Sequence, residues 1–170
     1  MAVRTQTLML LLLALTATAQ IPTQDPLTPQ EADQVRATAG QLDRRVPLLV
    51  GFAQERIAHF EQVRASSAPG RPAQMYALLR QYQRILPELN DAMDDLSSPP
   101  APGGPRYKVG KVLGKAVTQE KQMLAELQHI RSTSPAADLA TYHFELQNCL
   151  DATHDSMQIA EQDLADAGKK

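Results

Sequence analysis

The sequence contains no tryptophan and few other aromatic residues. Its 170 positions include three phenylalanines and four tyrosines, so that aromatic residues make up only 4% of the chain. Exposed rings form the surfaces that stack single-stranded nucleic acid and the cages that hold quaternary ammonium groups. The formal net charge of −2 also lacks the positive excess typical of nucleic-acid-binding domains. We therefore expect no nucleic-acid partner.

Cysteine, glycine and glycosylation signals are equally scarce. A single cysteine, Cys149, excludes an intrachain disulfide and any zinc cluster built from cysteines. The eight glycines form no glycine-rich loop of the kind that holds phosphate groups. Neither Asn90 nor Asn148 begins an Asn-x-Ser/Thr sequence. In an exported protein, these absences favour a bacterial cell envelope over a eukaryotic secretory pathway.

Residues 1–19 are typical of a cleaved secretory signal peptide. Arg4 gives a positive start, residues 8–15 are all apolar, and residues 17–19 (Ala-Thr-Ala) match the small-residue pattern before a cleavage site. The apolar run is far shorter than the roughly 20 residues that span a bilayer. We expect a protein exported to the periplasm or outside the cell, with no stable membrane insertion after cleavage. The alternative is an uncleaved signal anchor.

The start of the mature chain contains a lead-in and a short helix. Residues 20–28 contain two prolines and no periodicity, which indicates a flexible lead-in. Thr28, followed by a proline and then by Glu31, forms a capping-box pattern that predicts a helix over 29–39. We expect Val35 and Ala39 to face inward and Gly40 to end this helix.

The remainder of the chain has the three-and-four spacing of apolar residues that is typical of amphipathic helices. Proline- and glycine-rich stretches at 66–72 and 97–106, and a Ser-Pro pair near 135, divide it. The predicted helices are 43–65, capped by Asp43, then 72–96, 107–131 and 135–165. We expect Pro87 to kink the 72–96 helix or to interrupt its hydrogen-bond ladder. One alternative is a single helix over 29–66, kinked at Pro47.

These segments predict an all-α protein with one helical-bundle domain over 29–166 and a tail at 167–170. Short connections favour antiparallel neighbours. We therefore expect an up-down-up-down antiparallel four-helix bundle, with the short extra N-terminal helix packed at one end.

Charged residues cluster on both sides of the 97–106 loop. Acids precede the loop and lysines follow it, and both lie at the helix end whose dipole opposes them. We expect the two clusters to pair across an antiparallel hairpin. The alternative is a basic patch for an anionic lipid or another polyanion. The acids are Glu88, Asp91, Asp94 and Asp95, and the lysines are Lys108, Lys111, Lys115 and Lys121.

Two acid–histidine pairs have the spacing of ligands in di-iron bundles: Glu126 with His129, and Asp151 with His154. A metal site requires that such pairs face the bundle interior. Helical spacing places Glu126 beside the apolar stripe and the other three residues toward solvent. We therefore expect solvated surface pairs, with no metal site and no cofactor.

No residue combination predicts catalysis. Cys149 lies on the apolar stripe without a neighbouring base, so we expect a buried, unreactive thiol or, alternatively, an intermolecular disulfide. His59 is expected to be half exposed, and His143 partly buried with a structural hydrogen bond. Every inward position that periodicity assigns is apolar, threonine or cysteine. We therefore expect no catalytic residue and no enzyme activity.

The sequence thus predicts an exported, non-catalytic helical-bundle protein. Its expected role is binding an unidentified protein partner or client in the cell envelope. The alternative is a four-helix bundle that binds a small ligand or a metal. The bundle interior separates the two, because a dry apolar core favours the first, and inward histidines and carboxylates or a sizeable cavity favour the second. The pattern leaves the oligomeric state open.

Cleavage after Ala19 is the first testable prediction. The mature protein should begin at Gln20, because residues 17–19 present the small side chains that signal peptidase accepts. Intact-mass analysis of the exported protein measures this directly. An exported chain that retains residues 8–15 would contradict the prediction.

Overall fold

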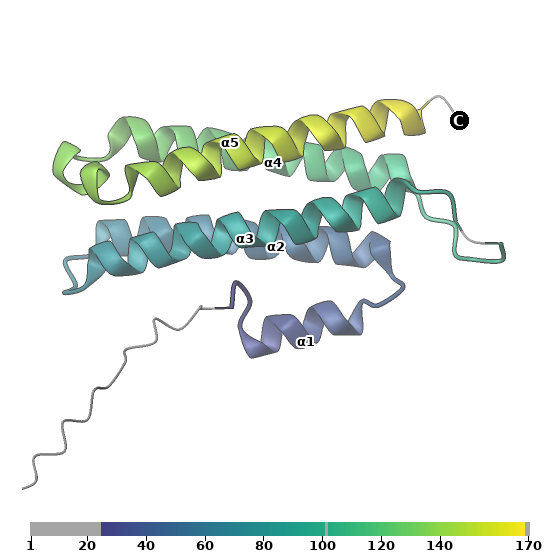
Figure 1. Cartoon of the computed structure of the whole chain (residues 1–170), viewed down its shortest axis with the longest axis horizontal. Helices are drawn as coiled ribbons and strands as arrows, with labels where there is room; N and C mark the ends of the chain where they lie inside the picture. Colours follow the sequence, from purple (N-terminus) through teal and green to yellow (C-terminus); the bar gives the residue numbers. More distant parts are fainter. Residues whose placement is uncertain (1–24, 101, 169–170) are drawn as a thin grey trace, which may run out of the picture.

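The computed structural model of the chain describes residues 25–100 and 102–168. The predicted signal peptide and most of the predicted lead-in lie outside these residues. The described part folds into five helices and contains no strand (Figure 1). No helix within it has the length and apolarity needed to cross a membrane. The helices are α1 (Pro29–Ala37), α2 (Leu42–Ala65), α3 (Arg71–Ser97), α4 (Val109–Thr133) and α5 (Ala136–Ala167).

The first two helices are separate, as predicted. The Thr28 hydroxyl accepts a hydrogen bond from the Glu31 amide, and the Glu31 carboxylate accepts one from the Thr28 amide, which confirms the capping box. Gly40 takes a φ of 72°, a left-handed conformation that glycine adopts without a steric penalty. Two details differ: Ala39 is exposed, and Gln41 rather than Asp43 precedes α2.

Two prolines lie inside helices without dividing them. Pro47 is in α2 and Pro87 in α3, and both are exposed. Water can therefore hydrate the backbone carbonyl that each proline leaves without its helical partner. Pro87 removes one hydrogen bond from the helical ladder, and α3 nevertheless runs as one helix from Arg71 to Ser97.

The four long helices lie along a common direction, with α1 outside them (Figure 1). Contacts join α2 to α3 and α4, and α5 to the same two helices, whereas α3 and α4 scarcely touch. The expectation that α3 and α4 are neighbours is therefore wrong. Residues 98–108 supply enough chain to cross the end of the bundle, so this connection joins helices at opposite corners.

The core is apolar along most of its length. Phe60 and Tyr142 meet edge to face with ring centroids 5.3 Å apart, and Leu49, Leu89 and Leu113 are fully buried. Tight packing of such side chains is the main source of stability in a helical protein.

A buried ion pair attaches α1 to this core. The Arg56 guanidinium of α2 donates to both Glu31 carboxylate oxygens, at 2.9 and 2.6 Å, and to the Pro26 carbonyl at 2.9 Å. Burial tends to raise the pKa of Glu31, but the bonds from Arg56 and Thr28 together lower it below its usual value. Leu27, inside the predicted lead-in, is also buried.

The charge clusters beside the 97–106 loop do not pair with each other. Within the described residues, none of Asp91, Asp94 and Asp95 forms an ion pair with a lysine of α4. Lys121 instead pairs with Glu161 of α5, at 2.7 Å. The predicted pairing is wrong because α3 and α4 occupy opposite corners of the bundle.

Reversal of the α4 lysines tests this arrangement. Replacing Lys108, Lys111 and Lys115 with Glu should leave the free energy of unfolding unchanged or raise it by up to about 1 kcal/mol at low salt, because acids suit the positive N-terminal end of a helix. Chemical unfolding followed by circular dichroism measures the change. A clear loss of stability that high salt removes, and that is the same at all protein concentrations, would instead indicate intrachain pairing.

Candidate functional site

The structure places the two acid–histidine pairs on the outside of the bundle. His129, Asp151 and His154 are exposed, and Glu126 is half buried. Three of these four side chains form a hydrogen bond with a glutamine four residues away on the same helix. Glu126 accepts from Gln122 at 2.9 Å, and Asp151 accepts from Gln147 at 2.8 Å. His154 forms a hydrogen bond with Gln158 at 3.0 Å. In residues 25–100 and 102–168, no three side chains of His, Cys, Asp or Glu are placed to hold one metal ion.

Cys149 and the two other histidines considered in the sequence analysis differ in burial. Cys149 is fully buried and its thiol donates to the Leu79 carbonyl at 3.3 Å, and burial raises its pKa above the usual range. His59 is exposed. His143 is exposed rather than partly buried, and its ring lies 3.9 Å from that of Phe144. The expectation for His143 is wrong because its neighbour Tyr142, one position earlier, takes the inward place.

A polar feature that the sequence analysis did not predict is a buried network between three helices. Glu120 of α4 and Ser156 of α5 are both fully buried. The Ser156 hydroxyl lies 2.5 Å from a Glu120 carboxyl oxygen and 2.5 Å from the Asn90 side-chain oxygen of α3. The expectation that inward positions hold only apolar residues, threonine and cysteine is therefore wrong.

The two hydrogen bonds of the Ser156 hydroxyl, to Asn90 and to Glu120, require two hydrogen atoms, and this hydroxyl carries one. A hydroxyl carries a single hydrogen, so it can donate to Asn90 or to Glu120 but not to both. Both bonds form when the Glu120 carboxyl is protonated and donates to Ser156, which in turn donates to Asn90. A neutral Glu120 therefore satisfies both bonds when the Asn90 side-chain oxygen faces Ser156, as it does here.

Burial acts on Glu120 in the same direction. Loss of hydration raises the pKa of Glu120 from 4.5 to about 7, although the Ser156 bond lowers it; the negative charge of Glu161 also raises it. The second carboxyl oxygen of Glu120 has no hydrogen-bond partner among the described residues, so ionisation there is poorly compensated.

A second set of buried hydrogen bonds lies next along α5. The Thr153 hydroxyl donates to the Cys149 carbonyl at 2.6 Å, which leaves its oxygen to accept from the Tyr82 hydroxyl, also at 2.6 Å. Burial raises the pKa of Tyr82 well above its usual range, so this phenol stays neutral. Glu120, Ser156, Tyr82 and Thr153 are fully buried, whereas Asn90 is partly exposed.

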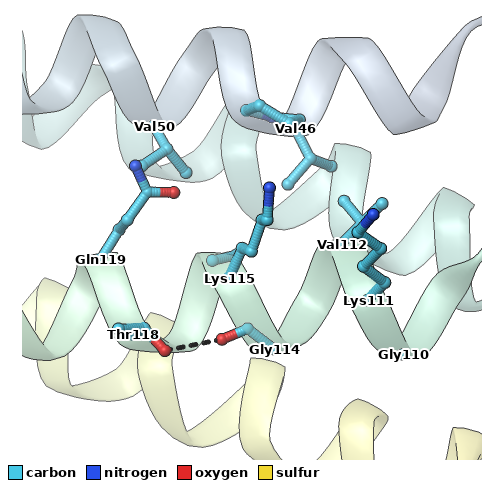
Figure 2. Close-up of a pocket in the computed structure, with 11 residues that line it drawn as sticks. Val46, Val50, Gly110, Lys111, Val112, Gly114, Lys115, Thr118 and Gln119 are labelled. Atoms are coloured by element: carbon cyan, nitrogen blue, oxygen red, sulfur yellow. Dashed lines mark hydrogen bonds between the residues drawn. The ribbon is translucent and has the colours of Figure 1, made fainter.

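A surface groove lies between α2 and α4, on the side of α4 that faces away from the Glu120 network. It encloses about 600 Å³. Val46 and Val50 of α2 form an apolar wall, and Figure 2 shows Lys115 extending from α4 toward α2 beside them. Lys111 also lines the groove, and none of the described residues that line it is acidic.

Comparison of the chain with protein-family models, with curated proteins and with solved structures found no match.

Substitution of Glu120 tests the network. The folded chain keeps a proton on this carboxyl up to about pH 7, whereas the unfolded chain loses it near pH 4.5. The group's contribution to stability is therefore full at low pH and falls by about 3 kcal/mol as pH rises from 4 to 8. Glu120→Gln should remove this decline, because an amide does not titrate.

Urea unfolding of both proteins at pH 5 and pH 8 measures the difference. All other titrating groups are common to the two chains and cancel in the comparison. Equal pH dependence in native and Glu120→Gln proteins would contradict a buried neutral carboxyl.

Proposed function

We propose that the chain is an exported, non-catalytic helical-bundle protein that binds a partner or client protein of the cell envelope through its outer surface. The observation that carries this proposal is the exposure of Phe144, whose side chain is 75% accessible on the outer face of α5. A phenyl ring left in water costs free energy that only contact with another apolar surface recovers.

The surroundings of Phe144 support its use as a contact. The His143 ring lies against it at 3.9 Å, which limits the positions the phenyl ring can take. Ala140 and Thr141, one turn earlier, are small and exposed, so they leave the ring open to a partner. Ile159 on the same helix is 46% exposed. Protein interfaces are commonly centred on aromatic side chains of this kind.

The polar core supports a non-catalytic role. A carboxyl with a pKa near neutrality suits proton transfer, and Glu120 has one. A general acid or base must also reach its substrate, however, and Glu120 and Ser156 are both fully buried. Their bonds join α3, α4 and α5, which favours a structural role.

We further propose an up-down-up-down antiparallel arrangement of the four long helices, with one connection across the diagonal. The contacts of α2 with α3, and of α4 with α5, support two antiparallel hairpins. The contacts of α3 with α5, and of α2 with α4, then join helices that run the same way. Export to the periplasm or the outside of the cell is proposed from residues 1–19 alone.

Small-ligand binding is a second candidate, favoured by the groove between α2 and α4. Its apolar wall of Val46 and Val50 faces the ammonium groups of Lys111 and Lys115 (Figure 2). This combination suits a small amphiphile with an anionic head and an apolar tail. Calorimetric titration with a medium-chain fatty acid, repeated on Lys115→Glu, tests this candidate.

Photocrosslinking tests the primary proposal. A benzophenone amino acid at position 144, in the chain exported by its own cells, should give a covalent adduct with a second protein. The same amino acid at Gln128, an exposed polar position on α4, is the matched control and should give none. Once the partner is identified, Phe144→Ser should weaken its binding at least tenfold and Phe144→Tyr should retain it.

Failure to crosslink at both 144 and 159 would contradict the proposal, because these positions hold the large apolar side chains most exposed on α5.

A further inference from the structure

Opposite charges gather at two corners of one end of the bundle. In Figure 1, α3 and α5 end, and α2 and α4 begin, at the right-hand end. We call Asp91, Asp94 and Asp95 of α3 the acidic edge, and Lys108, Lys111 and Lys115 of α4 the basic edge. All six side chains are exposed, and none forms an ion pair within the described part of the chain.

The helix dipoles reinforce both edges. The acidic edge lies at the negative C-terminal end of α3, whose last turn has no basic residue. The basic edge lies at the positive N-terminal end of α4, whose first turn has no acidic residue. Charge and dipole have the same sign in each case, so each edge presents a strong potential to a neighbouring molecule.

An apolar hollow lies at this end, near the acidic edge and the start of α4. It encloses about 820 Å³. Its lining includes Leu96, Tyr107, Val109 and three prolines of the crossing connection, and also the charged residues Arg45, Asp95 and Arg106. The Tyr107 hydroxyl donates to the Gly40 carbonyl at 2.5 Å and thereby ties this connection to the loop before α2. An apolar centre with a charged rim is the usual composition of a protein interface.

We propose that a second copy of this chain docks on this end, so that the basic edge of each copy meets the acidic edge of the other. The proposal goes beyond the proposed function, because this contact lies at the end of the bundle and does not involve Phe144. The contact is end to end, and the two apolar hollows meet between the charged edges.

Symmetry explains why the partner is a second copy. The two edges lie at opposite corners of the same end, so a two-fold axis across that end exchanges them. A single two-fold contact therefore forms both edge-to-edge pairings at once and closes at a dimer. Lys108 and Asp95 lie nearest this end, whereas Lys115 and Asp91 each lie about 9 Å from the end of their helix.

Analytical ultracentrifugation of the exported chain at 20 and 500 mM salt tests the association. The expected result is twice the monomer mass at low salt and a dissociation constant at least tenfold weaker at high salt, because exposed charge contacts are screened. A monomer at both salt concentrations, up to millimolar protein, would overturn the proposal, as would an open-ended series of larger assemblies.

A charge swap tests the pairing of the edges. The base-reversed variant (Lys108→Glu, Lys111→Glu, Lys115→Glu) and the acid-reversed variant (Asp91→Lys, Asp94→Lys, Asp95→Lys) should each be monomeric. Their equimolar mixture should restore a dimer. Both reversals relieve an unfavourable helix dipole, so both variants should fold, which thermal unfolding by circular dichroism verifies.

A matched control separates edge pairing from net charge. Replacing the exposed residues Glu55, Asp151 and Asp155 with Lys makes the same charge change away from this end. This control should still dimerise by itself and should not pair with the base-reversed variant. A dimer that survives either reversal, or a swap mixture that stays monomeric, overturns the proposal. Crosslinking at Phe144 does not depend on these edges, so the two proposals fail separately.

Discussion

The diagonal course of residues 98–108 determines how charge is distributed over the molecule. Because this connection joins helices at opposite corners, α2 lies beside α4 and α3 beside α5. In the antiparallel arrangement that we propose, the members of each pair run the same way. Two positive helix ends therefore share one side of the bundle end, and two negative helix ends share the other. In a bundle whose neighbours are all antiparallel, these dipoles would alternate and largely cancel. The acids of α3 and the lysines of α4 strengthen the separation instead of neutralising it.

The buried polar groups set a second constraint, on the relative positions of the helices. Cys149, Thr153 and Ser156 follow one inner line of α5, where their polar groups meet Leu79, Tyr82 and Asn90 of α3. Leucine and valine side chains can pack in several sliding positions, but each of these hydrogen bonds forms in only one. Glu120 extends the same requirement to α4 through Ser156. A slip of one helical turn would bury these polar groups without partners, at a cost of about 1–3 kcal/mol for each.

The sequence predicted which segments form helices. It predicted less well which helices are neighbours and which polar residues are buried. The signals before α1, between α2 and α3, and before α5 are local, and the observed bounds fall within about two residues of the predictions. Adjacency is not local, because an eleven-residue connection reaches a neighbouring corner or a diagonal one equally well. The burial of Glu120 did leave a signal: Ala116, Glu120 and Met123 continue the three-and-four spacing, and only the residue type argued against an inward position. Periodicity was the better guide there.

The separation of the two charged edges also determines how they respond to salt. Neighbouring helix axes about 9 Å apart place diagonal axes about 13 Å apart, and the outward side chains lie farther still. That distance exceeds the Debye length of about 8 Å at physiological ionic strength, so attraction between the edges within one chain is largely screened. In the proposed dimer, the groups nearest the bundle end, such as Lys108 of one chain and Asp95 of the other, face each other across the contact at distances shorter than the Debye length. Because the acidic and basic edges lie at opposite corners, they do not pair within one chain, and each can contact another molecule. On adjacent helices, the two edges would pair with each other instead.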